Sequence, residues 1–413
     1  MPRIDPDRVL GDLKRLREFG AYRTGVHRPT YSADDMAARH WFAGRMAAAG
    51  LAPTMDGIGN IIGRSPGSGR RPRILTGSHL ESQNQAGWLD GPLGVVYGLE
   101  AARALSEDAA FNSAAVDVGV WADEEGHFGN FLGSHSFCGE LEEKEIDEAA
   151  DRTLGTPMRD ALAQAGLAGR PRETFAKGEY AAYVEAHIEQ GDWLEANKLR
   201  LGIVTSIVGI WQYRVLFEGV QNHAGTTRMA IRKDAGVALT RFAVEIEETF
   251  PQVCGPRSVW TTGRITLDPG APSVIPGRAE MLFQIRDGSP EVLARLEGKL
   301  FEMAAAADAK GPCRVRAESL RKSTPAVMDA RVQAALEAAA ERHAPGLYTR
   351  MPSGAGHDAQ IFARHMPAGM LFVPSIGGIS HHWSEDTREE DIVLGARVFA
   401  DAVAGLLGGD ALA

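Results

Sequence analysis

Cysteine is scarce in this sequence, and the three that occur, Cys138, Cys254 and Cys313, lie far apart. No two of them have the CxxC spacing of a metal knot or a redox centre, and an odd number of separated cysteines does not fit a disulfide framework. Disulfide bonds are rare in reducing compartments. We therefore expect a cytoplasmic protein.

Long apolar runs and an excess of positive charge are also missing. No apolar run approaches the roughly 18 residues of a membrane helix, and the first residues lack the apolar core of a signal peptide. Lys and Arg number 44 against 54 Asp and Glu, so the formal net charge is −10. A nucleic-acid surface would need a basic stripe. We therefore predict neither a membrane nor a nucleic-acid partner.

What is present fits a globular protein of two domains. The chain has 413 residues, of which 44% are hydrophobic and 24% charged, and this length exceeds one ordinary core. Strand and helix patterns alternate over most of the chain, which predicts an α/β domain with a mixed, largely parallel sheet flanked by helices. From about residue 210 the order becomes strand, helix, two strands, helix, strand, which fits a small α+β (ferredoxin-like) domain. We predict a catalytic metal-binding domain at 1–209 and 326–413, with an inserted domain at 210–325.

Potential metal ligands follow the predicted strands. His79 comes after a strand at 72–76 with Asp90 further along, and Glu124 and Glu125 close a strand at 116–122. In an open α/β sheet, loops at the carboxyl ends of strands carry the chemistry, and imidazole and carboxylate suit zinc, manganese or cobalt. Adjacent buried carboxylates repel each other unless a cation is present. The pair therefore suits one metal ligand and one base.

Further histidines recur in similar places. His187 ends another apolar strand, and His357 and His381 follow Gly-rich turns. His223 lies in a small polar loop of the inserted domain. Taken singly, each is more often a surface or capping residue. Their recurrence at strand ends, together with the carboxylates above, favours a two-metal hydrolase site.

Six motifs in order along the chain together resemble one enzyme family. They are GSH…DG…G at 77–94, EEG at 124–126, HIEQG at 187–191, NHAGTT at 222–227, SGAGHD at 353–358 and GISH at 378–381. The combination is similar to the hydantoinase/carbamoylase branch of the dinuclear zinc aminoacylase and carboxypeptidase superfamily. This branch includes N-carbamoyl-L-amino-acid hydrolases, β-ureidopropionases and allantoate amidohydrolases. The resemblance extends over residues 10 to 405.

The resemblance implies a role for each matching position. His79 and His187 would bind one metal ion, Glu125 and His381 a second, and Asp90 would bridge the two. Glu124 would be the general base. His223 would stabilise the oxyanion from the lid domain, that of a partner subunit. The substrate-contacting positions would be Gln190, His223, Ser273, Arg286, Gly356 and His357.

The chain also departs from the family pattern. Glu81 stands where the family usually has Asp, and Ser273 where it has an Asn that helps to bind the substrate carboxylate. Arg228 and His382-Trp383 replace a common Pro and Asn-Pro, and Trp88 adds a large aromatic ring beside the metal loop. The metal machinery therefore matches, while positions that would specify the substrate are altered.

Two local expectations concern the metal loop. The carboxylate of Glu81 could hydrogen-bond the ring of His79 and so support this ligand. The peptide bond after the bridging Asp is cis in the superfamily, so a strained cis bond is expected at Asp90-Gly91.

Together these residues predict an enzyme, a metal-dependent amidohydrolase that cleaves the N-carbamoyl or a related N-acyl amide bond of an amino-acid-like substrate. Two divalent ions per subunit are expected, zinc first, with manganese, cobalt or nickel as alternatives. The expected partners are a small amide or ureido substrate and a second copy bound through the lid domain, as a homodimer. The alternatives are an allantoate or ureido-acid amidohydrolase, an aminoacylase-like or dipeptidase-like hydrolase, and a non-catalytic binding protein with a degenerate site.

Overall fold

The computed structural model describes residues 2–66, 73–111 and 115–408. The chain divides into two compact units, unit 1 (Met1–Thr205 and Val327–Ala413) and unit 2 (Ser206–Ala326). Of the strand expected at 72–76, Pro72 lies outside the described residues. No helix in the described part of the chain has the length and apolarity to cross a membrane.

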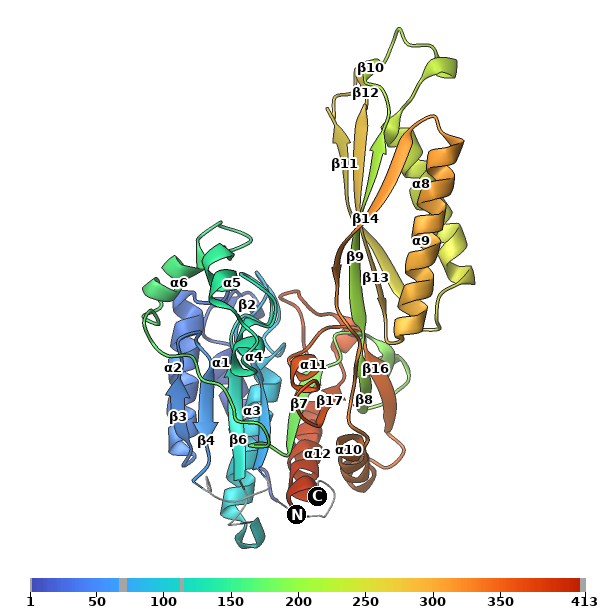
Figure 1. Ribbon diagram of the computed structural model, residues 1–413. Coiled ribbons are helices and arrows are strands. Elements are labelled where there is room, and N and C mark those ends of the chain that lie inside the picture. Colours follow the sequence, from blue (N-terminus) through green and yellow to red (C-terminus); the bar gives the residue numbers. More distant parts are fainter. Residues whose placement is uncertain (1, 67–72, 112–114, 409–413) are drawn as a thin grey trace. The chain divides into compact units, whose positions relative to one another are not determined.

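Unit 1 is built on a nine-stranded mixed sheet flanked by helices, as the sequence predicts (Figure 1). The strand order is β15-β8-β17-β7-β5-β6-β4-β3, and β16 pairs with β8. The central strands β17, β7, β5 and β6 are parallel, whereas β8 and β4 run antiparallel to their neighbours. The strands are β3 (Ala52–Met55), β4 (Ile61–Arg64), β5 (Arg73–His79), β6 (Ala115–Trp121), β7 (Ala182–Ile188), β8 (Leu201–Ile207), β15 (Ala326–Val327), β16 (Tyr348–Ser353) and β17 (Ala368–Val373).

Helices α1 and α2 of unit 1 begin where the sequence supplies capping side chains. Asp5 accepts hydrogen bonds from the backbone N–H groups at the start of α1, and Ser32 accepts one at the start of α2. Helices α3 and α12 pack against each other and against the central strands. The unit contains α1 (Pro6–Leu16), α2 (Ala33–Ala48), α3 (Pro92–Glu107), α4 (Leu132–Phe137), α5 (Glu143–Glu148), α6 (Met158–Gln164), α7 (Trp193–Ala196), α10 (Ala330–His343), α11 (Ala359–Phe362), α12 (Glu389–Gly408), and the hairpin β1 (Ala21–Tyr22) and β2 (Gly25–Val26).

Three central strands are buried along their whole length. Every residue of β5, β6 and β7 is buried, which explains their nearly continuous apolar sequences. Because these strands are parallel, their carboxyl ends meet at one edge of the sheet. His79 is the last residue of β5, and His187 lies next to the end of β7.

Unit 2 is a four-stranded antiparallel sheet with two long helices (Figure 1). The sheet order is β11-β13-β9-β14, so β11 and β14 are its edges. Burial alternates along β13, and its inward side chains pack on α8 and α9 in a separate core. The elements are β9 (Gly209–Glu218), β10 (Asn222–His223), α8 (Ala235–Thr249), β11 (Val259–Asp268), β12 (Val274–Ile275), β13 (Arg278–Asp287), α9 (Pro290–Lys310) and β14 (Arg314–Lys322).

Candidate metal and catalytic site

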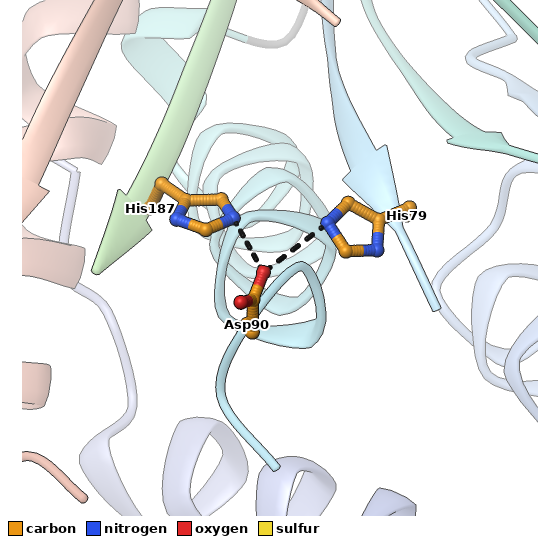
Figure 2. A group of neighbouring side chains, drawn as sticks. All are labelled: His79, Asp90 and His187. Carbon is orange, nitrogen blue, oxygen red and sulfur yellow. Dashed lines mark ion pairs between the residues drawn. The ribbon is translucent and has the colours of Figure 1, made fainter. Parts of the chain in front are cut away.

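The first group of candidate ligands surrounds one oxygen of Asp90. His187 Nε2 lies 3.1 Å and His79 Nε2 3.4 Å from Asp90 Oδ1 (Figure 2). The histidines come from adjacent parallel strands, and Asp90 precedes helix α3. All three are buried, and their ligand atoms lie within 4.8 Å of one another.

The second group uses the other oxygen of the same carboxylate. His381 Nε2 lies 3.4 Å from Asp90 Oδ2 and 3.6 Å from Glu125 Oε2. These three residues also have ligand atoms within 4.8 Å of one another. Asp90 therefore belongs to both groups, with one oxygen facing each, which is the arrangement that a bridging ligand needs.

The buried histidines are oriented as metal ligands are. The Nδ1 atom of His79 lies 3.0 Å from the backbone oxygen of Glu81, and that of His187 lies 2.9 Å from the backbone oxygen of Ile188. A proton on Nδ1 that is donated to the carbonyl leaves the lone pair of Nε2 facing the site. His79 Nε2 is buried and has no hydrogen-bond partner, which costs free energy unless a ligand fills the gap. The donor set therefore fits divalent ions.

The electrostatics of the site also favour a cation. Burial raises the pKa of Glu124 well above its usual value, and the neighbouring charge of Glu125 adds to the effect. Burial by itself would lower the pKa of His79, but the nearby carboxylates, first that of Glu124, raise it well above its usual range. The hydrogen bond to Asp90 raises the pKa of His381 to about 9. Without a metal, the carboxylates would hold protons on these histidines, so a bound metal would displace protons.

Two residues that sequence reasoning missed hold the ligands in place. Gln83 donates from its backbone N–H and from its side-chain amide to the two carboxylate oxygens of Glu125, both at 3.0 Å. Glu385 accepts hydrogen bonds from the backbone N–H groups of Leu89 and Asp90, both at 3.2 Å. Burial and the charge of Asp90 raise the pKa of Glu385 to about 8. Proximity to the motifs was the only signal in the sequence that could have pointed to them.

The predicted role of the Glu81 side chain is wrong. The ring of His79 bonds the backbone oxygen of Glu81, whereas the nearest carboxylate oxygen lies 3.9 Å from the ring nitrogen. The carboxylate instead accepts a hydrogen bond from the backbone N–H of Glu124 at 2.6 Å and pairs with Arg39 at 2.5 Å. Glu124 itself lies beside the first group, with Oε2 3.6 Å from His79 Nε2.

Two further expectations about the metal loop are corrected. Trp88 is 4% exposed and packs in the core of unit 1, with the guanidinium of Arg17 over its ring, so it is a packing residue. The bond between Asp90 and Gly91 is not among the cis bonds of the described residues, which precede Pro269 and Pro312. The sharp turn before α3 is made instead by Gly91, whose φ is +85°.

The predicted substrate residues of unit 1 lie close to the ligands. Gln190 donates from its side-chain amide to Asp90 Oδ2 at 2.8 Å. The ring of His357 packs against that of His187 with centroids 4.6 Å apart, and its Nε2 bonds the hydroxyl of Ser353. Gly356 lies against Phe131, whose ring a Cβ would meet at 2.8 Å. With 1% exposure, His357 is placed to support His187 more than to face solvent.

The predicted substrate residues of unit 2 are not all brought together. His223 is in β10, and the backbone N–H of the next residue, Ala224, donates to the backbone oxygen of Ser273. His223 and Ser273 are therefore neighbours. Strands β10 and β12 lie beyond one end of the four-stranded sheet (Figure 1). It is the Arg278 end, because β12 ends three residues before Arg278, which pairs with Glu218 at the end of β9, whereas Arg286 is at the other end of β13. From Arg278 to Arg286 a strand extends roughly 27 Å. Within one subunit, His223 and Arg286 cannot contact the same small molecule.

The ring of His223 has a defined tautomer. Its Nδ1 accepts hydrogen bonds from the backbone N–H groups of Gly225 and Thr226, at 3.0 and 3.2 Å. In the neutral ring the proton is therefore on Nε2, which is free to donate outward. A donor of this kind is what a developing oxyanion requires.

Known proteins resemble the chain over nearly its whole length. Peptidase family M20/M25/M40 matches residues 75–405. The N-carbamoyl-L-amino acid amidohydrolase of Geobacillus stearothermophilus is 34% identical, over 98% of this chain and 100% of that protein. The allantoate amidohydrolase of Bacillus subtilis (strain 168) is 33% identical, over 94% and 95%. The crystal structure of an amidase (hydantoinase/carbamoylase family) from Burkholderia phymatum has a TM-score of 0.91 and 48% identity, over 99% of both chains.

Proposed function

The chain belongs to peptidase family M20/M25/M40 and, within it, to the hydantoinase/carbamoylase amidases, and we propose that it hydrolyses the N-carbamoyl group of an amino-acid-like substrate. It is an enzyme of the hydrolase class that acts on carbon–nitrogen bonds in linear amides, as its amidohydrolase relatives are. The observation that carries the hydrolytic part of the proposal is the shared carboxylate of Asp90, with Glu124 beside it, and the N-carbamoyl class of substrate is proposed from the carbamoylase relatives. A related N-acyl group is the closest alternative substrate.

Two divalent ions would be held by the two groups of ligands. His79 and His187 would hold one ion, and Glu125 and His381 would hold the other. Asp90 would contribute a ligand to both ions. When bound, such ions lower the pKa of water and polarise the attacked carbonyl. Imidazole and carboxylate donors favour zinc, with manganese, cobalt or nickel as alternatives.

The side chains of the protein would move the protons and stabilise the charge. The Glu124 carboxylate would take a proton from the attacking water and return it to the leaving nitrogen. Burial raises the pKa of Glu124, which favours the protonated form that gives the proton to the leaving nitrogen. The Nε2–H of a His223 ring would donate to the oxyanion, and one such donor typically contributes about 3–4 kcal/mol. Arg286 offers a planar guanidinium for a substrate carboxylate.

The separation of His223 and Arg286 within unit 2 supports a homodimer. If both act on one substrate, they must come from different subunits, so each site would be completed by the His223 of a second copy. The exposed edge strand β11, with Val259, Ile265 and Leu267 at least 42% exposed, would be the surface that pairs. Unit 2 would thus serve as the lid and dimerisation domain.

A substrate panel tests the proposed function. The metal-replete protein would be offered N-carbamoyl, N-formyl and N-acetyl amino acids and allantoate, with ammonia, formate and acetate as readouts. Release of ammonia with the free amino acid is the expected result. Failure to turn over any member with two equivalents of metal bound would contradict the proposal.

A ureido acid such as allantoate is the second candidate, because an allantoate amidohydrolase resembles the chain as closely as the carbamoylases do. Relative kcat/KM values in the same panel would separate the two. We also propose a cytoplasmic location, which the free state of Cys138, Cys254 and Cys313 supports.

A further inference from the structure

Three fully buried charged side chains form a connected path that ends at Glu124. Arg39 Nε donates to both carboxylate oxygens of Asp35 at 3.0 Å, and Arg39 Nη2 donates to Glu81 Oε2 at 2.5 Å. The other oxygen of Glu81 accepts the backbone N–H of Glu124 at 2.6 Å. All three charged side chains are 0% exposed.

Because the burial of these charges costs free energy, the three side chains must keep a well-defined geometry. An ion pair excluded from water is tolerated only when its geometry is good and its remaining donors and acceptors are satisfied. Arg39 largely meets this condition, because Nη1 also donates to the backbone oxygen of Gly59 and Nη2 to that of Trp121. The remaining acceptor of the Glu81 carboxylate is Oε1, and its partner is the backbone N–H of Glu124.

Arg39 and Glu81 form hydrogen bonds to the backbone on both sides of the sharp turn after β6. Arg39 holds the backbone oxygen of Trp121, the last residue of the strand, and Glu81 holds the backbone N–H three residues later. Asp123 lies between them with φ of +57°, a left-handed conformation that is uncommon for a non-glycine residue. The backbone of Glu124 is thereby fixed directly behind its carboxylate.

We infer that Glu81 is a positioning residue for the general base: it holds Glu124 through its backbone N–H and does not support the metal ligand His79 through its carboxylate. This inference rests on the proposed role of Glu124. The His79 ring takes its support from the backbone oxygen of Glu81, which no substitution at residue 81 other than proline need disturb. The side chain and the main chain of one residue thus serve two different parts of the site.

Kinetics and metal binding separate the two possible roles. Glu81→Ala should lower kcat by about 10–100-fold, the usual effect of losing a supporting residue, because small misplacements of a reacting group are costly. KM and the dissociation constant for zinc should stay within about threefold, since the partner of the His79 ring is retained. Glu81→Gln keeps one acceptor oxygen for two donors, so its kcat should lie between those of wild type and Glu81→Ala.

Hydrogen exchange gives a readout that needs no turnover. In the wild-type protein the N–H of Glu124 is bonded to a buried acceptor, so it should exchange slowly. In both variants, mass spectrometry of peptides that contain residues 122–128 should show exchange at least about tenfold faster. Peptides from β6 itself should be unchanged, because a global loss of stability would affect them as well.

Asp12→Asn is the matched control. Asp12 is a buried carboxylate that pairs with Arg45 and Arg103 at 2.9 and 2.8 Å, within the same unit but outside the site. This variant should lose stability without a change in kcat or in the exchange of Glu124.

Two results would overturn the inference. One is a zinc dissociation constant raised tenfold or more in Glu81→Ala with kcat restored at saturating zinc, which would make Glu81 a support for the ligand. The other is wild-type kcat and exchange in both variants. If Glu81→Ala does not fold, Glu81→Gln decides the matter by the same measurements. Wild-type protein that binds zinc yet hydrolyses no amide would instead refute the proposed function, and the exchange data would still test the positioning.

Discussion

At the scale of single residues, the site depends on how one carboxylate is shared. Asp90 offers one oxygen to His79 and His187 and the other to His381. The backbone N–H of Asp90 donates to Glu385, and Gln83 donates to the carboxylate of Glu125. Removing the base and removing a ligand should therefore have separable effects, because Glu124 is outside both groups of ligands.

The substitution Glu124→Gln should abolish most turnover while the metal stays bound. The amide cannot accept a proton from water, and general-base catalysis typically contributes about 10²–10⁴-fold. Steady-state kinetics with metal content by mass spectrometry would check both effects. His187→Ala serves as the contrasting variant, because it should lose metal. Near-native activity of Glu124→Gln would exclude this residue as the base.

A second residue-scale prediction concerns pH and stability. Asp56 accepts backbone hydrogen bonds from Ile58, Asn60 and Glu173, yet burial raises its pKa to about 6. Because the folded chain holds this proton more tightly than the unfolded chain, the stabilising contribution is complete below about pH 4 and is lost as pH rises through about 6.

The neutral variant Asp56→Asn should lack this pH dependence. The NH2 group of the new side chain would face backbone N–H donors, so the variant should be less stable than wild type at pH 4. This difference in stability should shrink between pH 4 and pH 7. The change should be on the order of 2–3 kcal/mol, at 1.36 kcal/mol per pKa unit. Urea unfolding at several pH values would measure it. Parallel curves for the two proteins would contradict the assignment.

At the scale of elements, strand ends and turns position the chemistry. Three non-glycine residues at the site, Asp123, Gln190 and His381, have φ between 54° and 59°. Such conformations cost free energy and are found at functional sites. Gly91 has the same handedness at the start of α3 and lies against the ring of His79.

The substitution Gly91→Ala should therefore damage the metal site. A Cβ at this position would lie 2.5 Å from ring atoms of His79 and would be strained by the positive φ. We expect metal affinity to fall by about 10–100-fold, as measured by calorimetric titration. Gly11→Ala in α1 is the control, because its Cβ meets no atom within 4 Å and should add about 0.5–1 kcal/mol of stability. Unchanged affinity in Gly91→Ala would show that α3 can shift freely.

Most elements could be predicted from periodicity, and strand β16 is one that was missed. The buried strands β5, β6 and β7 read as apolar runs, and the capped helices carry their start signals. Strand β16 gave no such signal, because Tyr348–Ser353 is mostly polar and contains Pro352. Among the described strands it pairs with β8 alone, and a proline is compatible with a strand at the edge of a sheet.

At the scale of the whole molecule, a small unit is inserted into the chain of a larger one. Unit 2 carries His223, predicted for catalysis, near one end of its sheet and Arg286, predicted for substrate binding, at the other, and a single copy cannot use both ends on one substrate. We therefore expect the functional molecule to contain two copies of the 44.3 kDa chain. Light scattering should give about twice this mass.

The substitution Ile265→Lys should convert this dimer to monomer. Ile265 is 50% exposed on the edge strand β11, and charges on an edge strand block pairing. Loss of the dimer should also lower activity, because His223 would no longer reach the active site of a second copy. Leu320→Lys on the opposite edge strand β14, where Leu320 is 46% exposed, should leave the mass unchanged. A monomeric wild-type protein with full activity would refute the shared site.

The class of fold and the expected reaction chemistry both follow from local features of the sequence. The residue types at His79, Asp90, Glu124 and Glu125 predict which ligands and which base are available, and their order after apolar runs predicts that they lie at strand ends. Local periodicity and capping suffice for this, since both depend on residues near one another in the chain.

Which of these groups contact one another depends on the tertiary structure. Glu81 was expected to serve the ring of its neighbour, but folding brings Arg39 and Glu124 to its carboxylate. In the same way it buries Trp88 in the core and separates His223 from Arg286. Hydrogen bonds and packing join residues that are distant in the chain, and a local pattern carries no information about which buried donor a given acceptor will meet.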